Sequence, residues 1–255
     1  MEKGTIIGLP IGFGCVLVGG VLEGMALKSI YGPIAFMIVI GGAFGACCVE
    51  FTFEHIKIAF KLAKLVFTGG HHDYKSLVDQ IMKLAAVARK DGLLALEKER
   101  ESIADPLLKD ALRFAIDGLE PGVVQGILES RIDYRLHENG VGAKFWSQFG
   151  AYCPTVGIVG AVMGLIVVMN NLSNPDAIGP GIAVAFIATI YGVAFSNLVF
   201  MPMGNKLKVI CGHDEQYYEM IKVGIRNIQQ GTSPAIIESQ LYAIIDQQAQ
   251  EDAAA

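Results

Sequence analysis

The sequence predicts an all-α, polytopic membrane protein with four transmembrane helices and a helical cytoplasmic domain. First, 53% of the 255 residues are hydrophobic and only 18% are charged, which is too apolar for an ordinary soluble domain of this size. Second, four apolar stretches are long enough to cross a bilayer. Third, the remaining stretches carry apolar residues at the three-to-four spacing that is typical of amphipathic helices.

We expect four segments along the chain: a transmembrane hairpin (1–50), a cytoplasmic helical domain (51–148), a second transmembrane hairpin (149–203) and cytoplasmic C-terminal helices (204–255). Basic residues set the orientation. Of the 20 Lys and Arg residues, 14 lie in residues 52–148 and 4 in residues 204–255, while the connections 23–33 and 170–179 carry only Lys28. Because basic loops stay in the cytoplasm, both termini and the large loop are expected there.

The first hairpin begins with an apolar stretch over residues 5–22. It is longer than the apolar region of a signal peptide, about 7–15 residues, and no cleavage site follows it. Gly4, Gly8 and Gly12 form a tandem GxxxG pattern, which permits close helix packing or reflects simple glycine richness. The second span covers residues 34–49. Charged and apolar residues then alternate at helical spacing, so we expect this helix to continue unbroken out of the membrane to residues 68–70.

The cytoplasmic segments show helix boundaries. One helix carries Leu77, Ile81 and Leu84 on one face and ends at Asp91-Gly92. Two later helices begin at Asp105-Pro106 and Glu120-Pro121, where an acidic residue precedes proline in the first turn. The second of these is expected to continue into the third span. The fourth span should continue into an amphipathic helix that ends at Gly231, and a closing helix starts at Ser233-Pro234.

The second hairpin contains spans at residues 150–169 and 180–203, and neither carries a charged side chain. Pro154 and Pro202 both fall at the cytoplasmic mouth, where each removes a backbone hydrogen bond and permits a kink. One hypothesis is a joint that passes a change in the membrane to the cytoplasmic domain; the alternative is a fixed bend of the kind membrane helices tolerate.

An ion path through lipid needs an ionisable or strongly coordinating group. The third and fourth spans have hydroxyls and amides but no Asp, Glu, His, Lys or Arg, so any titrating carboxylate must come from another chain. No zinc, phosphate-loop, dinucleotide or nucleophile-base motif occurs in the sequence. We therefore expect neither an enzyme nor a metal protein, and we interpret the five cysteines as small apolar residues.

Three stretches carry a family resemblance: ARKDGLLALE (88–97), CPTVGIVGAVMGL (153–165) and NPDAIGPGIAVAFIATIYGVAFSNLVFMP (174–202). Together with the four-span layout, they resemble the A subunit of the bacterial flagellar stator, the MotA/PomA family. The resemblance implies a homopentamer in the bacterial inner membrane around two copies of a single-span, peptidoglycan-binding partner of the MotB/PomB type. The partner's aspartate would bind the ion, and ion flow would be converted into torque on the rotor protein FliG.

The same resemblance implies roles for individual residues. Pro154 and Pro202 would couple conformational changes, and Thr189 would lie beside the ion path. Arg89, Lys90 and Glu97 would contact FliG, although charged residues of this kind are also typical of a solvated helical surface. In PomA an acidic run follows the position of Glu97, whereas here the next residues are Lys98-Glu99-Arg100. This departure leaves the exact contacts with FliG open.

The translocated ion, H⁺ or Na⁺, is the only small species that the resemblance implies. Sodium-driven relatives carry threonine in both spans near the partner's aspartate, whereas here the third-span position is Ala161. The missing oxygen favours protons, but the fourth span is more similar to that of PomA, which keeps sodium possible. The alternative function is a motor like TolQ or ExbB that energises an envelope process; those proteins have three spans and lack the first hairpin.

Overall fold

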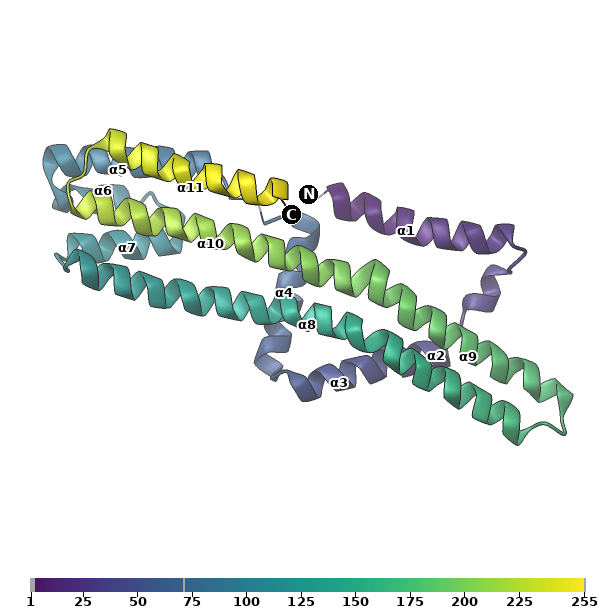
Figure 1. Cartoon of the computed structure of the whole chain (residues 1–255). Helices are drawn as coiled ribbons and strands as arrows, with labels where there is room; N and C mark the ends of the chain where they lie inside the picture. Colours follow the sequence, from purple (N-terminus) through teal and green to yellow (C-terminus); the bar gives the residue numbers. More distant parts are fainter. Residues whose placement is uncertain (1–2, 71, 255) are drawn as a thin grey trace. The chain divides into compact units, whose positions relative to one another are not determined.

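The computed structural model describes residues 3–70 and 72–254, apart from the side chains of residues 175, 177 and 247–254. Over this range the chain is helical and contains no strand, which confirms the predicted class (Figure 1). Four helical stretches are long and apolar enough to cross a membrane: Lys3–Leu22, Leu27–Glu50, Pro121–Asn170 and Ile178–Gln229. The chain divides into two compact units, residues 1–70 with 138–209 and residues 71–137 with 210–255. We refer to them as the membrane unit and the second unit.

The membrane unit includes residues 51–70 and 138–148, which the sequence analysis had grouped with the cytoplasmic domain. The reason is the packing of helix α4 (Phe53–Thr68) on helix α8 (Pro121–Asn170). The indole Nε1 of Trp146 donates a hydrogen bond of 2.9 Å to the carbonyl of Ala59. The side chains of Phe60 and Trp146 also stack edge to face, with ring centroids 5.1 Å apart.

The first hairpin consists of α1 (Lys3–Leu22), a short 3₁₀ turn (η1, Leu27–Ile30) and a second span built from three consecutive segments. These segments are α2 (Pro33–Phe36), a π-helical stretch (η2, Met37–Gly41) and α3 (Gly42–Glu50).

The expectation that the second span continues unbroken out of the membrane is wrong. Phe51 and Thr52 have extended backbone, and the Thr52 side chain accepts a hydrogen bond from the amide of His55, which caps the separate helix α4. A capped break of this kind starts a new helix in a new direction.

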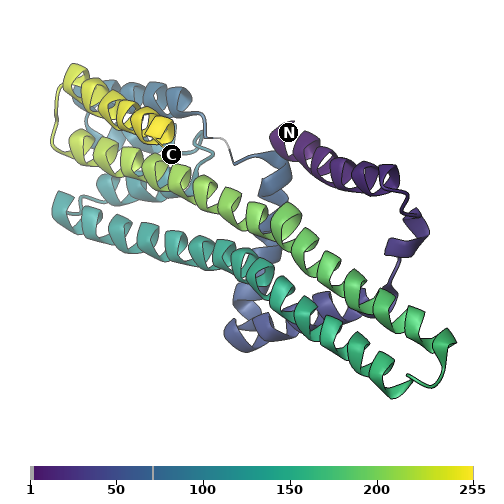
Figure 2. The ribbon, with the colours of Figure 1, turned by 45° about the vertical axis from the view of Figure 1, so that its right-hand side comes forward.

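The second hairpin pairs the C-terminal part of α8 with α9 (Pro175–Phe195), a second π-helical stretch (η4, Ser196–Phe200) and the start of α10 (Met201–Gln229). Figures 1 and 2 show these helices side by side and antiparallel. As predicted, α8 is continuous from Pro121 through the third span, and the fourth span continues into α10. The positive φ of Gly231 (67°) follows the end of α10, a conformation that favours glycine.

The second unit contains α5 (Tyr74–Asp91), η3 (Leu93–Ala95), α6 (Leu96–Arg100), α7 (Pro106–Ile116) and α11 (Pro234–Ala254), together with parts of α8 and α10. The predicted boundaries are confirmed: Gly92 has a φ of 82° after α5, and the Asp105 carboxylate accepts a hydrogen bond of 2.9 Å from the amide of Leu108. Helix α11 packs against α5. All these helices contribute aliphatic side chains to one core, which includes Leu77, Ile81, Leu108, Leu112, Leu128, Ile221, Ile225 and Leu241.

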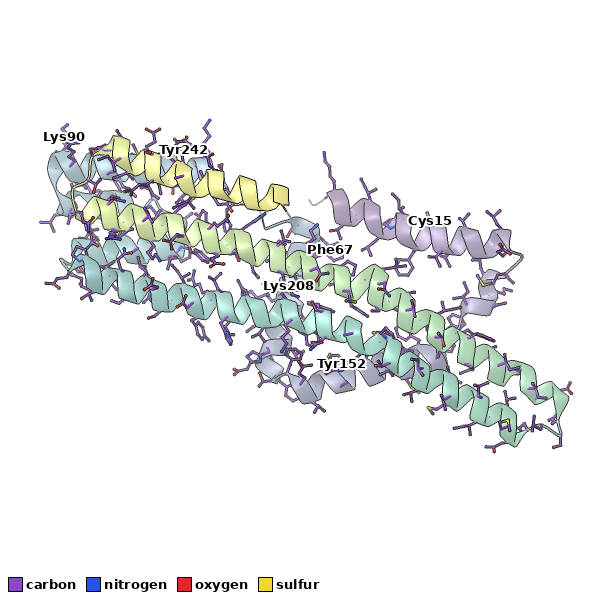
Figure 3. All side chains as sticks on the ribbon, viewed as in Figure 1. Cys15, Phe67, Lys90, Tyr152, Lys208 and Tyr242 are labelled. Atoms are coloured by element: carbon purple, nitrogen blue, oxygen red, sulfur yellow. The ribbon has the colours of Figure 1, made fainter. Side chains whose placement is uncertain are left out.

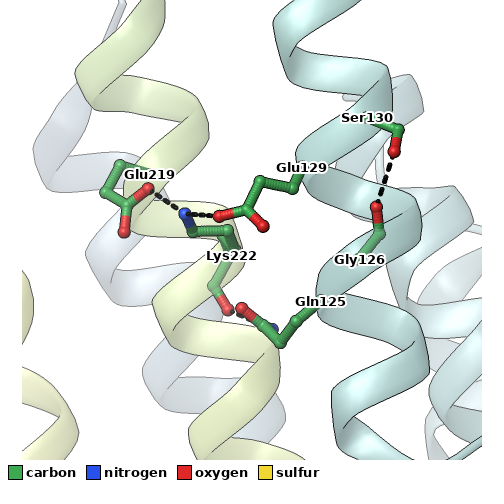
Figure 4. A network of polar contacts seen from close by, with 6 residues as sticks. All are labelled: Gln125, Gly126, Glu129, Ser130, Glu219 and Lys222. Carbon is green, nitrogen blue, oxygen red and sulfur yellow. Dashed lines mark hydrogen bonds and ion pairs between the residues drawn. The ribbon is translucent and has the colours of Figure 1, made fainter.

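A polar network also joins α8 and α10 within the second unit (Figure 4). The Lys222 ammonium group lies 2.7 Å from the Glu219 carboxylate and 3.2 Å from that of Glu129, and the Gln125 amide donates to the Lys222 carbonyl. Partial burial alone would lower the pKa of Lys222, but the hydrogen bonds to the two carboxylates outweigh it and raise this pKa above its ordinary value. The network therefore keeps Lys222 charged and fixes the register of the two helices.

Candidate functional site: the second transmembrane hairpin

Glycines set the distance between α8 and α9. A Cβ atom built on Gly157 would lie 2.9 Å from the Ala188 carbonyl oxygen, and one on Gly164 would lie 2.7 Å from the Gly181 carbonyl oxygen. Both distances are shorter than a carbon atom tolerates, and the obstructing atoms are backbone. Only glycine therefore permits this approach, in the manner of small-residue contacts between membrane helices.

Pro154 lies inside α8 at this contact and is half-buried. A Cβ built on Gly192 of α9 would lie 2.7 Å from the Cys153 carbonyl oxygen and 3.1 Å from the Pro154 Cα. Because proline has no N–H, the carbonyl of Gly150 lacks its normal helical donor. The proline thus sits where the two backbones touch and where the hydrogen-bond ladder of α8 is interrupted.

Pro202 lies in the first turn of α10, directly after the π-helical stretch η4. The Met201 amide donates to the Ser196 carbonyl five residues earlier. A Cβ on Gly150 would lie 2.9 Å from the Met201 nitrogen, so the irregular part of the fourth span faces the part of α8 that Pro154 interrupts. Neither π-helical stretch is predicted by the sequence pattern; such stretches are frequent at functional sites.

Thr189 and Ala161 lie at the same level of the hairpin. Gly160 and Ala188 are in contact, since a Cβ on Gly160 would lie 2.8 Å from the Ala188 Cβ, and each is followed by one of the two residues. Thr189 is exposed, and its hydroxyl donates to the Ala185 carbonyl at 3.1 Å. The Thr189 oxygen therefore keeps its lone pairs available to accept a hydrogen bond from outside the helix.

Other polar groups of the fourth span have internal partners. The Tyr191 hydroxyl donates to the Ile30 carbonyl at 2.6 Å and accepts from the Gly32 amide at 3.2 Å, which ties α9 to the turn of the first hairpin. The Asn197 amide donates to the Val193 carbonyl at 2.9 Å. The sequence predicts neither contact, because a phenol or an amide in an apolar helix signals only that some partner exists.

A cavity of about 390 Å³ lies beside Pro202, between the start of α1, the end of α4 and η4. Lys206 reaches into it and donates a hydrogen bond of 2.6 Å to the Thr5 hydroxyl, which in turn donates to the Val66 carbonyl at 2.9 Å. This chain of hydrogen bonds holds the end of α4 and the beginning of α1 against α10.

Arg89, Lys90 and Glu97 lie in the second unit and are all exposed. Arg89 and Lys90 occupy the last turn of α5, where cations are favoured by the helix dipole, and Figure 3 labels Lys90 at the end of that helix. Glu97 lies on α6, beyond the turn at Gly92, and pairs with Arg100 at 2.8 Å. The charges thus come from two helices, and no single helix face carries them.

Among the described residues, no group of three His, Cys, Asp or Glu side chains is arranged to hold a metal ion. The polar side chains described above on the fourth span carry hydroxyl and amide groups.

Comparisons with known proteins agree with this architecture. Residues 99–220 match the model of the MotA/TolQ/ExbB proton channel family, and residues 6–92 match the motility protein A N-terminal model. Motility protein A of Bacillus subtilis is 31% identical over 94% of this chain and 90% of its own length.

Two solved structures are similar over nearly the whole chain. The MotAB structure from C. jejuni aligns with a TM-score of 0.90 at 32% identity and covers 96% of each chain. The flagellar MotAB stator complex from Bacillus subtilis aligns with a TM-score of 0.85 at 30% identity and covers 95% of this chain and 96% of the other. The chain therefore belongs to the MotA/TolQ/ExbB proton channel family, as a stator subunit of the flagellar motor.

Proposed function

We propose that this stator subunit forms a homopentamer around two copies of a MotB/PomB-type single-span, peptidoglycan-binding partner, and that the assembly converts ion flow into torque on FliG. The similar structures are of MotAB, which supports a MotB-type partner. The assembly lies in the bacterial inner membrane and in contact with its lipid, with both termini and the large loop in the cytoplasm. This orientation is supported by the distribution of basic residues.

The proposed ion path rests on the position of Thr189 in the fourth span. Thr189 is exposed on an otherwise apolar helix, and its hydroxyl proton is engaged by the Ala185 carbonyl. Such an oxygen accepts a hydrogen bond from a protonated carboxyl group of the partner and releases it when the proton leaves. The proton acceptor itself is then the partner's aspartate, and the hairpin supplies the surface along which it is loaded.

Protons are the ion that we favour over sodium. A hard cation such as Na⁺ prefers several oxygen ligands, and Ala161 at the level of Thr189 supplies none. H⁺ needs only the carboxylate of the partner, so no further cofactor is required.

Pro154 and Pro202 are the coupling residues in this proposal. Both interrupt the helical ladder where α8 and the fourth span touch, so a change at the partner's carboxylate reaches the helices that continue into the second unit. Arg89, Lys90 and Glu97 then form the surface that contacts FliG, with charge complementarity steering the encounter.

The first experiment is the purification of the tagged chain from its host in mild detergent, followed by native mass determination. Five copies of this chain with two copies of a single-span, aspartate-bearing protein are expected. Recovery of the chain without such a partner, or with a different ratio, would contradict the proposed assembly.

The second experiment measures proton uptake by proteoliposomes that contain the purified complex. Thr189→Val keeps the shape of the side chain and removes its oxygen, and we expect uptake to fall about tenfold, because one hydrogen bond to a charged or protonated carboxyl group is worth about 1.5 kcal/mol. Thr155→Val on the neighbouring span is the matched control and should leave uptake unchanged. Uptake that depends on Na⁺ instead of pH would overturn the choice of ion.

A further inference from the structure

Helix α4 presents a second face that the fold covers only in part, where the Phe60 ring contacts Trp146 of α8. Its buried face, Ile56, Ala59, Leu62 and Val66, packs inside the membrane unit. Beside this buried face, Phe53, Phe60 and Phe67 are 76%, 50% and 42% exposed, and Figure 3 labels Phe67 on this helix. Three large aromatic side chains in contact with water would be unfavourable, so this face is covered in the working protein.

Lysines lie among these aromatic residues. The spacing of seven between the phenylalanines keeps them on one side of the helix, with a drift of about 20° per seven residues. Lys57 and Lys64 each lie four residues after a phenylalanine, and Lys61 lies four after Lys57, so all three are neighbours on that side. They are exposed, and no ion pair joins them to another described residue. Glu54 is the one acidic residue in the same part of the helix, so the face carries net positive charge.

Three contacts place α4 across one end of the membrane spans. It begins at Phe53, with only two residues between it and the end of the second span at Glu50. Its middle packs on residues 142–146 of α8, just before the third span, where a Cβ on Gly142 would lie 2.7 Å from a Leu62 methyl carbon. Its end is bonded to the first turn of α1 through Thr5 and Val66. Figures 1 and 2 show α4 crossing the direction of α8.

A helix that touches the same end of three spans lies along the surface of the bilayer. At 1.5 Å per residue, its 16 residues extend for roughly 24 Å in that plane. The pairing of an aromatic stripe with lysines matches the boundary between acyl chains and headgroups, where rings enter the apolar layer and ammonium groups reach phosphates.

We propose that the exposed face of α4 is a binding surface for anionic phospholipid headgroups in the adjacent leaflet, with Lys57, Lys61 and Lys64 as the phosphate contacts and Phe53, Phe60 and Phe67 inserted beside them. Lipid binding at this face involves neither the translocated ion nor the contact with the rotor. It makes the membrane unit selective for the charge of the surrounding lipid.

Lipid preference is tested with the complete complex, purified with its partner and supplied with equal amounts of phosphatidylglycerol and phosphatidylcholine. Native mass spectrometry counts the lipids that remain bound. The triple variant Lys57→Gln, Lys61→Gln, Lys64→Gln is expected to lose its preference for phosphatidylglycerol by at least tenfold, since each lysine at an anionic surface contributes about fivefold. The matched control replaces three exposed lysines of the second unit, Lys75, Lys98 and Lys109, and should keep the preference.

Insertion of the face is tested by fluorescence quenching with phosphatidylglycerol brominated in its acyl chains. Phe53→Trp adds an indole at a position that is 76% exposed, whereas the native Trp146 is only 5% exposed. We expect strong additional quenching for Phe53→Trp and none for Leu94→Trp, a control of equal exposure in the second unit.

Each outcome decides the proposal. An unquenched Phe53→Trp would show that something other than lipid covers the face and would overturn it. Quenching without a change in lipid preference in the lysine variant would remove the selectivity for anionic headgroups and would overturn it as well. Loss of a co-purifying acidic protein, with bound lipid unchanged, would assign the face to a protein partner instead.

Discussion

At the scale of single residues, the packing of the second hairpin depends on glycines, which have no Cβ, and on a proline, which has no backbone N–H. Gly157, Gly164 and Gly192 have no Cβ where another backbone passes, and Pro154 has no N–H where the ladder of α8 is interrupted. In lipid the hydrophobic effect does not drive helices together, so such close contacts and their van der Waals packing hold the hairpin. A single methyl group is then enough to disturb it.

Gly192→Ala provides the test. Its Cβ would meet two backbone atoms, the Cys153 carbonyl oxygen at 2.7 Å and the Pro154 Cα at 3.1 Å, and backbone cannot move aside as a side chain can. We expect a loss of about 1–3 kcal/mol in stability, as for other overpacked sites, and a loss of swimming. Thermal unfolding in detergent and motility assays measure the two effects. Gly45→Ala is the matched control, because no atom lies within 4 Å of the added carbon; equal damage from both variants would contradict the contact.

Cys211, in the second unit, offers a test of burial. Its partly buried position, and secondarily the nearby Asp214 carboxylate, raise the pKa of the thiol from 9.0 to about 11. Folding therefore favours the protonated thiol; this contribution to stability is complete below pH 9 and is lost as the pH rises towards 11. We expect the rate of Cys211 alkylation, followed by peptide mass spectrometry, to keep rising up to about pH 11. The exposed Ser239→Cys should level off near pH 9; the same profile at Cys211 would refute the shift.

At the scale of elements, the sequence predicted the helix starts and stops that depend on a few neighbouring residues. The Asp105-Pro106 start and the stops at Gly92 and Gly231 depend on a side-chain cap or a positive φ, and these can be recognised in a few residues. The break at Phe51-Thr52 was missed because the apolar pattern continues through it, and the new direction of α4 depends on distant contacts such as Trp146 with Ala59.

The candidate site shows the same division. The prolines were singled out by their position at the cytoplasmic mouth and Thr189 by the family resemblance, whereas the two π-helical stretches have no local signature beyond Pro202 itself. They follow from the packing of one helix against another, as at Gly150 and Met201. Rules based on 3.6 residues per turn do not reveal such a feature, because a single π-helical turn is too short to establish a period of its own.

Pro202→Ala tests the role of the irregular segment. Alanine restores an N–H that can bond to the Leu198 carbonyl, so the helix after η4 can become regular and stiffer. We expect swimming to stop while membrane insertion and the native mass of the assembly remain unchanged. Pro10→Ala is the control, since Pro10 lies inside α1, a helix with no buried residue. Normal swimming of the Pro202 variant would exclude a coupling role for this residue.

At the scale of the whole molecule, two continuous helices link the parts. Both α8 and α10 begin or end in one unit and continue into the other. In the proposed function, these two helices are the connection by which a change in the second hairpin would reach the second unit. The polar network around Lys222 joins these two helices again within the second unit, so they act there as a pair.

The last prediction concerns the far end of that path. Arg89 lies exposed in the last turn of α5, and reversal of its charge by Arg89→Glu places a carboxylate at the negative end of the helix dipole, at a cost of only about 0.3–1 kcal/mol. The fold and the assembly should therefore persist. Contact with a complementary rotor surface should be lost, because like charges at an interface cost several kcal/mol. We therefore expect swimming to stop.

Lys75→Glu, an exposed charge reversal in the first turn of the same helix, is the matched control and should leave swimming intact. Recovery of swimming when an acidic residue of FliG is changed to a basic one would establish the contact directly. If the Arg89 and Lys75 variants both swim normally, torque passes through another surface and the proposed rotor contact is wrong.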